Sequence, residues 1–303
     1  MNSRTSGGGP RYGNRWLPWA CAGITFLSCL AWAWVTPPFQ APDEPSHYAY
    51  AEILSVTGKP PLQGQADKLP WSSAESAALD AIWFPQVRGN PGGKPPWTEP
   101  DEGRVDELLN RPWPDGDGGG LGVDTTAGYP PLYYSLLVPA YAGTKAAGGD
   151  VIERLTAMRL VSCLLTALTV LFVFFFVREL VPGTALAAPV GALGVGLLPY
   201  LGFIGSSVNN DVLAMMLSAA LFYLLARAFR RGLGIGEGVA IGLVIVAGWA
   251  AKPIFLGLLP GALLGIVLLL ALSARSDLRA ALGSAAALFA TTLGAAAAYL
   301  LVT

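Results

Sequence analysis

Long apolar stretches, separated by short basic segments, occupy the start of the chain and its second half. Residues 17–36 contain no charged residue, which is about the length that a helix needs to cross a bilayer. We therefore predict an all-α polytopic membrane protein with about seven transmembrane helices and a large loop after the first. The expected spans are 16–36, 155–178, 185–205, 210–229, 237–252, 254–273 and 280–301.

The basic residues between these spans predict an orientation. With the N-terminus in the cytoplasm, every basic cluster falls on the cytoplasmic side, as the positive-inside rule requires. These residues are Arg4, Arg11, Arg15, Arg178, Arg227, Arg230, Arg231, Arg275 and Arg279. A cleaved signal peptide at Ala31-Trp32-Ala33 is the alternative for the first span, but that span is long and rich in aromatic residues.

This orientation divides the chain into four parts. We expect a cytoplasmic tail at 1–15, a first membrane helix at 16–36, an extracytoplasmic loop at 37–153 and a helical bundle at 154–303.

Within the loop, three segments have the pattern of helices. Residues 44–57 lack internal glycine and have Asp43 and Gly58 as caps, and a second short helix is expected in 72–84. Residues 85–128 are rich in Pro, Gly and Asp, so we expect only partial order there. The apolar residues 130–143 are too short to span and predict a helix along the membrane interface, with tyrosines at headgroup depth.

Composition and charge narrow the class of protein. The chain is 53% hydrophobic and 13% charged, with a mean hydropathy of +0.51, as expected for a multi-pass membrane protein. Residues 38–128 carry six Lys and Arg against fourteen Asp and Glu, which argues against nucleic acid as a partner. The three cysteines lie in apolar stretches and predict small core residues, not a metal site.

The first group with candidate chemistry follows the first span. Asp43 and Glu44 come directly after it, and His47, the only histidine, lies one turn further on. A carboxylate here can accept a proton from a hydroxyl or amine. With His47, and with Asp211 at a similar depth, it can instead hold a divalent cation such as Mg²⁺ or Mn²⁺. A plain helix cap in a solvated loop is the alternative.

The turn between two later spans carries the second group. Asp211 opens the next span, either as an ordinary N-terminal helix charge or as a residue that orients an acceptor. Asn209 and Asn210 would then be neutral hydrogen-bond partners for hydroxyl groups.

Basic residues on the expected outer side form the third group. Arg154 and Arg159 lie at the start of the second span, and Lys252 lies at the end of the fifth. Charges in such places are costly unless they are paired or bind a ligand, and a lipid phosphate is the natural partner. Snorkelling to headgroup phosphates is the alternative.

In this order, the motifs resemble those of the GT-C superfamily of membrane glycosyltransferases. The protein O-mannosyltransferases, the lipid A aminoarabinose transferases and, more closely, an uncharacterised bacterial branch are similar. The matching segments are Asp43-Glu44-Pro45, Pro130-Pro131-Leu132-Tyr133-Tyr134, Arg154 to Arg159, Asp211 and Ala251-Lys252-Pro253. There are two departures. Gly128-Tyr129 stands where many relatives have a lysine before the Pro-Pro segment, and the chain ends at Thr303, where relatives usually continue with more spans. The resemblance therefore implies either a truncated or compact form or a fragment whose acceptor-binding part is absent.

The resemblance implies a donor that is a polyprenyl-phosphate-linked sugar and an acceptor outside the cytoplasm, in a bacterial cytoplasmic membrane. Asp43 would be the general base, and Glu44 and Asp211 would position the acceptor or a cation. Arg159, Lys252 and Arg154 would stabilise the departing phosphate. The helix carrying Pro130, Pro131, Tyr133 and Tyr134 would guide the prenyl chain.

Two alternatives of other classes stay open. A flippase or transporter of the same lipid would bind the phosphate without a base, but it should carry polar residues through the bilayer midplane, and three of the spans carry almost none. A scaffold for envelope assembly would tolerate loss of Asp43 and Asp211.

Overall fold

The computed structural model of the chain describes residues 15–64, 69–88, 90–93, 96–111, 120–122 and 125–302. All regular structure in these ranges is helical, and none of the described residues is in a strand. The predicted all-α membrane fold is confirmed.

Five helices in the described part are long and apolar enough to cross a membrane. Three of them are α1 (Leu17–Val35), α7 (Val151–Leu180) and α10 (Asp211–Arg231). The fourth is formed by a 3-10 turn, η4 (Pro253–Leu258), that leads into α12 (Leu259–Ser276). The fifth is α13 (Leu278–Val302).

The remaining two predicted spans differ from expectation. The span expected at 185–205 is two helices, α8 (Ala187–Gly196) and α9 (Pro199–Gly205), bent by 61°. Leu198 is extended before Pro199, because a residue that precedes proline is pushed out of the helical region. The span expected at 237–252 is α11 (Ile235–Ala251), an apolar helix of 17 residues. Length and composition therefore support five to six spans, rather than seven.

The loop region folds into short helices and turns. Its elements are α2 (Glu44–Thr57), α3 (Ser73–Ala81), α4 (Phe84–Val87), η2 (Pro91–Gly93), α5 (Glu99–Asn110), η3 (Thr125–Gly128) and α6 (Leu132–Ala146). The helix predicted at 44–57 is confirmed with its end at Gly58, whose φ of 68° suits glycine. The region expected to be only partly ordered contains α5, while residues 112–119 lie outside the described part.

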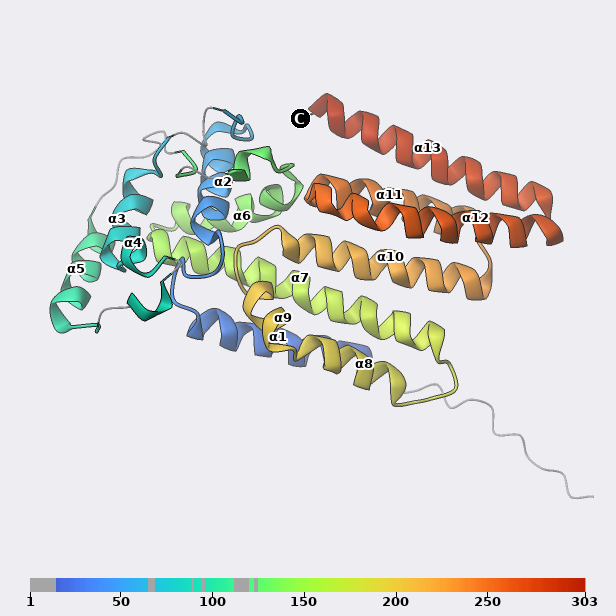
Figure 1. Ribbon diagram of the computed structural model, residues 1–303, viewed down its shortest axis with the longest axis horizontal. Coiled ribbons are helices and arrows are strands. Elements are labelled where there is room, and N and C mark those ends of the chain that lie inside the picture. The colour runs from blue at the N-terminus through green and yellow to red at the C-terminus, as the bar shows by residue number, and fades with distance from the viewer. Residues whose placement is uncertain are drawn as a thin grey trace, which may run out of the picture.

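Figure 1 shows how these elements are arranged. The loop helices gather at one end of the bundle, where α1 ends and where α7 and α10 begin. We call this end the loop face. The long helix α7 packs against α1, α8 and α10, while α11 packs against α13. Helices α2 and α6 pack on each other, and α6 packs on α7, so the loop region is joined to the membrane helices.

The opposite end of the bundle carries the later basic clusters, and we call it the basic face. There, the buried Glu179 at the end of α7 forms ion pairs with Arg230, at 3.1 Å, and with Arg231. The three cysteines are buried, which confirms that they are core residues.

Candidate functional site

The loop face is organised around a buried ion pair between Glu44 and Arg159. The Arg159 guanidinium donates to both carboxylate oxygens, with Nε–Oε1 at 2.9 Å and Nη2–Oε2 at 2.6 Å. Glu44 is fully buried and Arg159 is 4% exposed. The Val208 N–H also donates to Glu44, at 3.0 Å, so one carboxylate joins α2, α7 and the turn before α10.

The other donors of Arg159 bind the end of α1. Nη1 donates to the carbonyl oxygens of Ala33 and Thr36, at 2.9 and 2.8 Å, and Nη2 donates to that of Pro37, at 3.0 Å. The carbonyls of Ala33 and Thr36 are among those that a helix C-terminus leaves without an intrahelical partner, and Pro37 follows the C-cap. All five guanidinium donors are thus in use. The predicted phosphate-binding role of Arg159 does not fit this geometry, and a structural role does.

Asp43 lies beside this pair but points into solvent. It occupies the N-cap position of α2, yet its side chain makes no capping hydrogen bond. Its φ of 56° places it in the left-handed region, which costs energy for a residue with a side chain. The predicted side-chain cap is therefore wrong. The Asp43 carboxylate is instead exposed at the loop face.

His47 is buried and faces α6. Its Nδ1 lies 2.8 Å from the Tyr134 hydroxyl, and its ring stacks on Tyr129 and Tyr134. Among the described residues, no three His, Cys, Asp or Glu side chains come together as a metal site. The cation site predicted from Asp43, His47 and Asp211 is therefore wrong, and the donor set does not fit Mg²⁺ or Mn²⁺.

The tyrosines of α6 are core residues. Tyr133 and Tyr134 are both fully buried, and Tyr133 Oη lies 2.9 Å from Ser162 Oγ. Burial raises the pKa of Tyr133, so this phenol stays protonated. Direct contact with a prenyl chain, the role predicted for both residues, does not fit side chains that are buried inside the protein. Pro130 and Pro131, which precede the helix, are half-buried.

The turn 206–211 is bound to the loop region through its asparagines. The Asn209 N–H donates to Tyr133 Oη at 2.9 Å, and Asn209 Nδ2 donates to the Pro42 carbonyl at 3.5 Å. Asn210 is buried and donates through Nδ2 to Ala251 at 3.4 Å. The contact from Asn209 to Pro42 brings the Asp43 backbone next to the turn that carries Asp211.

Lys252 and Asp211 form an ion pair, with Nζ–Oδ1 at 2.7 Å. The Lys252 side chain is 15% exposed and that of Asp211 is 41% exposed. The Lys252 ammonium also lies 5.3 Å from the centre of the Tyr129 ring, at cation–π distance. The Tyr129 ring also stacks on that of His47.

Arg154 belongs to a separate polar group. Its Nε donates to Gly149 at 3.0 Å, and its guanidinium lies 5.6 Å from the centre of the Tyr141 ring. The Tyr141 hydroxyl donates to Glu52 at 2.8 Å. These contacts point to a structural role for Arg154, since they turn it toward α2 and α6.

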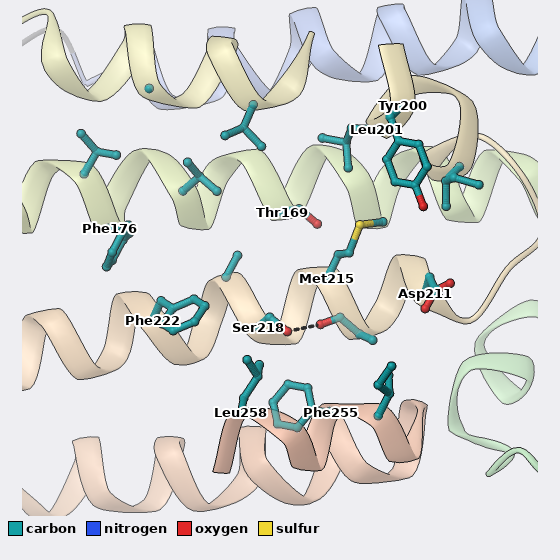
Figure 2. Close-up of a pocket in the computed structure, with 18 residues that line it drawn as sticks. Thr169, Phe176, Tyr200, Leu201, Asp211, Met215, Ser218, Phe222, Phe255 and Leu258 are labelled. Carbon is teal, nitrogen blue, oxygen red and sulfur yellow. Dashed lines mark hydrogen bonds between the residues drawn. The ribbon is translucent and has the colours of Figure 1, made fainter. Parts of the chain in front are cut away.

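An apolar cavity of about 820 Å³ lies beside the Lys252–Asp211 pair. It is lined by residues of α7, α8, α9, α10 and η4. Figure 2 shows Asp211 and Tyr200 at one end and Phe176 and Phe222 at the other. Asp211 is the one charged side chain among its lining residues in the described part. The cavity therefore has one charged end and a long apolar body.

The model of a family described as "Predicted membrane protein (DUF2142)" matches residues 26–303. The chain belongs to this family. No curated protein and no solved structure matches it. Membership of DUF2142 supports a multi-pass membrane protein in contact with lipids, while the GT-C resemblance stays a prediction.

Sequence reasoning missed two features of this DUF2142 protein. Glu75 on α3 is fully buried, and neither of its carboxylate oxygens has a hydrogen-bond partner among the described residues. Burial, and then the charge of Glu52, raise the pKa of Glu75 well above its usual value. The apolar cavity was also missed, because its lining comes from five separate elements. Neither feature leaves a recognisable signal in the local sequence.

Proposed function

We propose that this protein is a glycosyltransferase that moves a sugar from a polyprenyl-phosphate donor to an acceptor. The observation that carries the proposal is the apolar cavity that has Asp211, the ion-pair partner of Lys252, at its end. The exposed carboxylate of Asp43 follows Pro42, whose carbonyl accepts from Asn209 in the turn before Asp211. An amphiphile with a long apolar tail matches the body of this cavity, and the Lys252 ammonium next to Asp211 is the group that would receive an anionic headgroup.

The lipid tail of the donor occupies the body of the cavity. The Tyr200 hydroxyl lies at the end of the cavity near Asp211 (Figure 2). Two further hydroxyls in the wall, those of Thr169 and Ser218, each donate to a carbonyl of their own helix, at 3.0 and 2.7 Å. They therefore present little unsatisfied polarity to a ligand. The lining spans residues 211–222 of α10, about 16 Å of helix, which suits a chain of several isoprene units.

Lys252 binds the donor phosphate, as a point charge on a flexible stem. Arg159 acts indirectly, because its contacts to Glu44 and to the end of α1 hold Asp43 in place. The contacts of Arg154 lie with Tyr141 and Gly149, so we assign it no part in phosphate binding.

Asp43 is the general base. Its carboxylate takes the proton of the acceptor hydroxyl or amine as the acceptor atom attacks the anomeric carbon. The bond from that carbon to the phosphate oxygen breaks, and polyprenyl phosphate leaves with its negative charge next to Lys252. A single displacement of this kind inverts the anomeric configuration. Asp211 and Asn209 lie close enough to the Asp43 loop to orient the acceptor.

The position of the polar groups favours transfer over transport. A flippase must carry its charged headgroup across the membrane and needs polar groups along the way. In the described part, the charged lining of the cavity is confined to the end that carries Asp211. Lipid-linked donors also need no nucleotide, which suits a site outside the cytoplasm of a bacterium.

The test is a transfer assay on the purified full chain in lipid nanodiscs. Polyprenyl-phosphate-linked sugars are supplied with a crude envelope fraction as the source of acceptor, and released polyprenyl phosphate is measured by mass spectrometry. We expect Asp43→Asn to lower the release rate by about 10²-fold or more. The matched control is Asp106→Asn, which removes an exposed carboxylate of α5. Equal rates for wild type and Asp43→Asn would overturn the assignment of the base.

A further inference from the structure

The Lys252–Asp211 ion pair presents a difficulty for any anionic ligand of Lys252. In the structure, the ammonium is already held by the Asp211 carboxylate, at 2.7 Å. A phosphate that approaches Lys252 meets that negative charge at close range, and two anions on one ammonium repel each other. Binding of a phosphate therefore competes with the ion pair.

We propose that the Lys252–Asp211 pair is a latch that the headgroup phosphate opens, so that donor binding releases Asp211 at the mouth of the cavity. This inference rests on the proposed function for the identity of the lipid. It adds a regulatory step, in which Asp211 becomes free to bind an acceptor only after the donor phosphate has taken its place on Lys252.

The two partners are placed so that separation costs little. Asp211 is 41% exposed and begins the 21-residue helix α10, so water and the positive end of the helix dipole stabilise its carboxylate once Lys252 has left. Its own N–H donates to Asn209 Oδ1 at 2.9 Å, which holds the backbone in place. Lys252 keeps the face of Tyr129 as a second partner during the exchange.

The surroundings also make the exchange specific. The backbone of Lys252 is extended between α11 and η4, and Pro253 follows it directly. Ile254 and Phe255, the next two residues, line the cavity together with Asp211. The latch therefore lies at the junction between the apolar body of the cavity and its charged end, where a phosphate joined to a lipid tail would lie.

The latch predicts an effect opposite to that of an ordinary binding residue. Removing the charge of Asp211 should strengthen phosphate binding, because Lys252 then has no competitor. A partly exposed ion pair is worth up to ~1 kcal/mol, so we expect Asp211→Asn to tighten binding by about fivefold. Lys252→Ala should weaken it.

The experiment measures binding of polyprenyl phosphate, without sugar, to the full chain in nanodiscs by native mass spectrometry. Polyprenol without phosphate and inorganic phosphate are run in parallel, and they separate the contribution of the tail from that of the headgroup. Asp106→Asn again controls for loss of one carboxylate. Thermal melting checks that each variant folds. If Asp211→Asn does not fold, Asp211→Ser serves as the second variant.

A double variant that combines Asp211→Asn with Lys252→Ala distinguishes the latch from direct repulsion between Asp211 and the phosphate. If Asp211 acts by holding Lys252, the gain from Asp211→Asn disappears in the Lys252→Ala background. A gain that persists there, a loss of affinity in Asp211→Asn, or no binding by wild type and Asp211→Asn alike would each overturn the latch.

The latch and the proposed function fail in different ways. Tighter polyprenyl phosphate binding by Asp211→Asn, together with no sugar transfer by the wild type, would keep the latch and reject the transferase. Sugar transfer that depends on Asp43, together with unchanged binding in Asp211→Asn, would keep the transferase and reject the latch.

Discussion

Arg159 and Lys252 carry the same charge on the loop face, but their surroundings differ. Arg159 is buried, and all of its N–H groups donate either to Glu44 or to three carbonyls at the end of α1. Lys252 keeps a partly exposed partner and a ring face. The first arrangement holds the fold together, whereas the second can exchange one anion for another.

This contrast predicts different effects on stability. Arg159→Ala leaves the Glu44 charge buried without its partner, so we expect a loss of about 3–5 kcal/mol in the free energy of unfolding. Lys252→Ala breaks only a partly exposed pair and should cost less than ~1 kcal/mol. Thermal melting of both variants in the same detergent compares them. An Arg159→Ala protein that melts like the wild type but binds polyprenyl phosphate poorly would restore the phosphate-binding role.

Asp43 combines backbone strain with the proposed chemistry, and two substitutions separate these properties. Glycine adopts the left-handed conformation freely, so Asp43→Gly should stay within ~1 kcal/mol of the wild-type stability. Asp43→Val puts a branched side chain there and should lose about 1–2 kcal/mol. Both lack the carboxylate, so both should lose sugar transfer.

The measurement pairs chemical denaturation with the transfer assay. Asp43→Gly that folds normally and transfers sugar at the wild-type rate would remove Asp43 from the mechanism. Equal stability of the glycine and valine variants would show that the left-handed backbone carries no strain at this position.

At the scale of elements, the helices that follow local rules were the predictable ones. Helix α2 begins and ends where its pattern and Gly58 predict. Helix α5 was missed, although Thr98 and Asp101 form a capping box, because the surrounding Pro, Gly and Asp residues dominated the interpretation. The tyrosines of α6 were assigned to the interface because nothing local reveals that α2 and α7 cover them.

The docking of helix α3 should depend on pH, because α3 carries the buried Glu75. This carboxyl is buried, and burial together with the charge of Glu52 raises its pKa well above the usual 4.5. The folded pKa thus exceeds the unfolded one, so the contribution of Glu75 to docking of α3 is fully present below about pH 4.5. It is lost as the pH rises through the folded pKa, because an ionised Glu75 is buried near Glu52.

Hydrogen exchange measured by mass spectrometry across pH checks this prediction. We expect protection of residues 73–81 to fall as the pH rises in the wild type and to stay level in Glu75→Gln, which serves as the reference for the intrinsic pH dependence of exchange. Parallel pH profiles for the two proteins would mean that Glu75 does not control the docking of α3.

At the scale of the whole molecule, composition and hydropathy predicted the class, and the spacing of apolar stretches predicted most of the helices. The ion pairs between residues far apart in the sequence could not be predicted. Nothing in the sequence joins Glu44 to Arg159, or Asp211 to Lys252, because those contacts depend on how α7, α10 and α11 pack. The expected metal site failed for the same reason, since helical spacing placed His47 near Asp43 while the fold turned it toward Tyr134.

The distribution of charge over the two faces predicts how the protein lies in the membrane. Arg230 and Arg231 lie on the basic face with Glu179, and Arg178 and Arg275 end their helices there. The positive-inside rule therefore predicts that the basic face lies in the cytoplasm and the loop face outside. Single cysteines at Lys59, after α2, and at Gly183, between α7 and α8, report on the two faces. The native cysteines are buried and should react little. In bacterial spheroplasts we expect a membrane-impermeant maleimide to label Lys59→Cys directly and Gly183→Cys only after permeabilisation. The reverse pattern would place Asp43 and Lys252 in the cytoplasm, where the proposed chemistry would need a donor on that side instead.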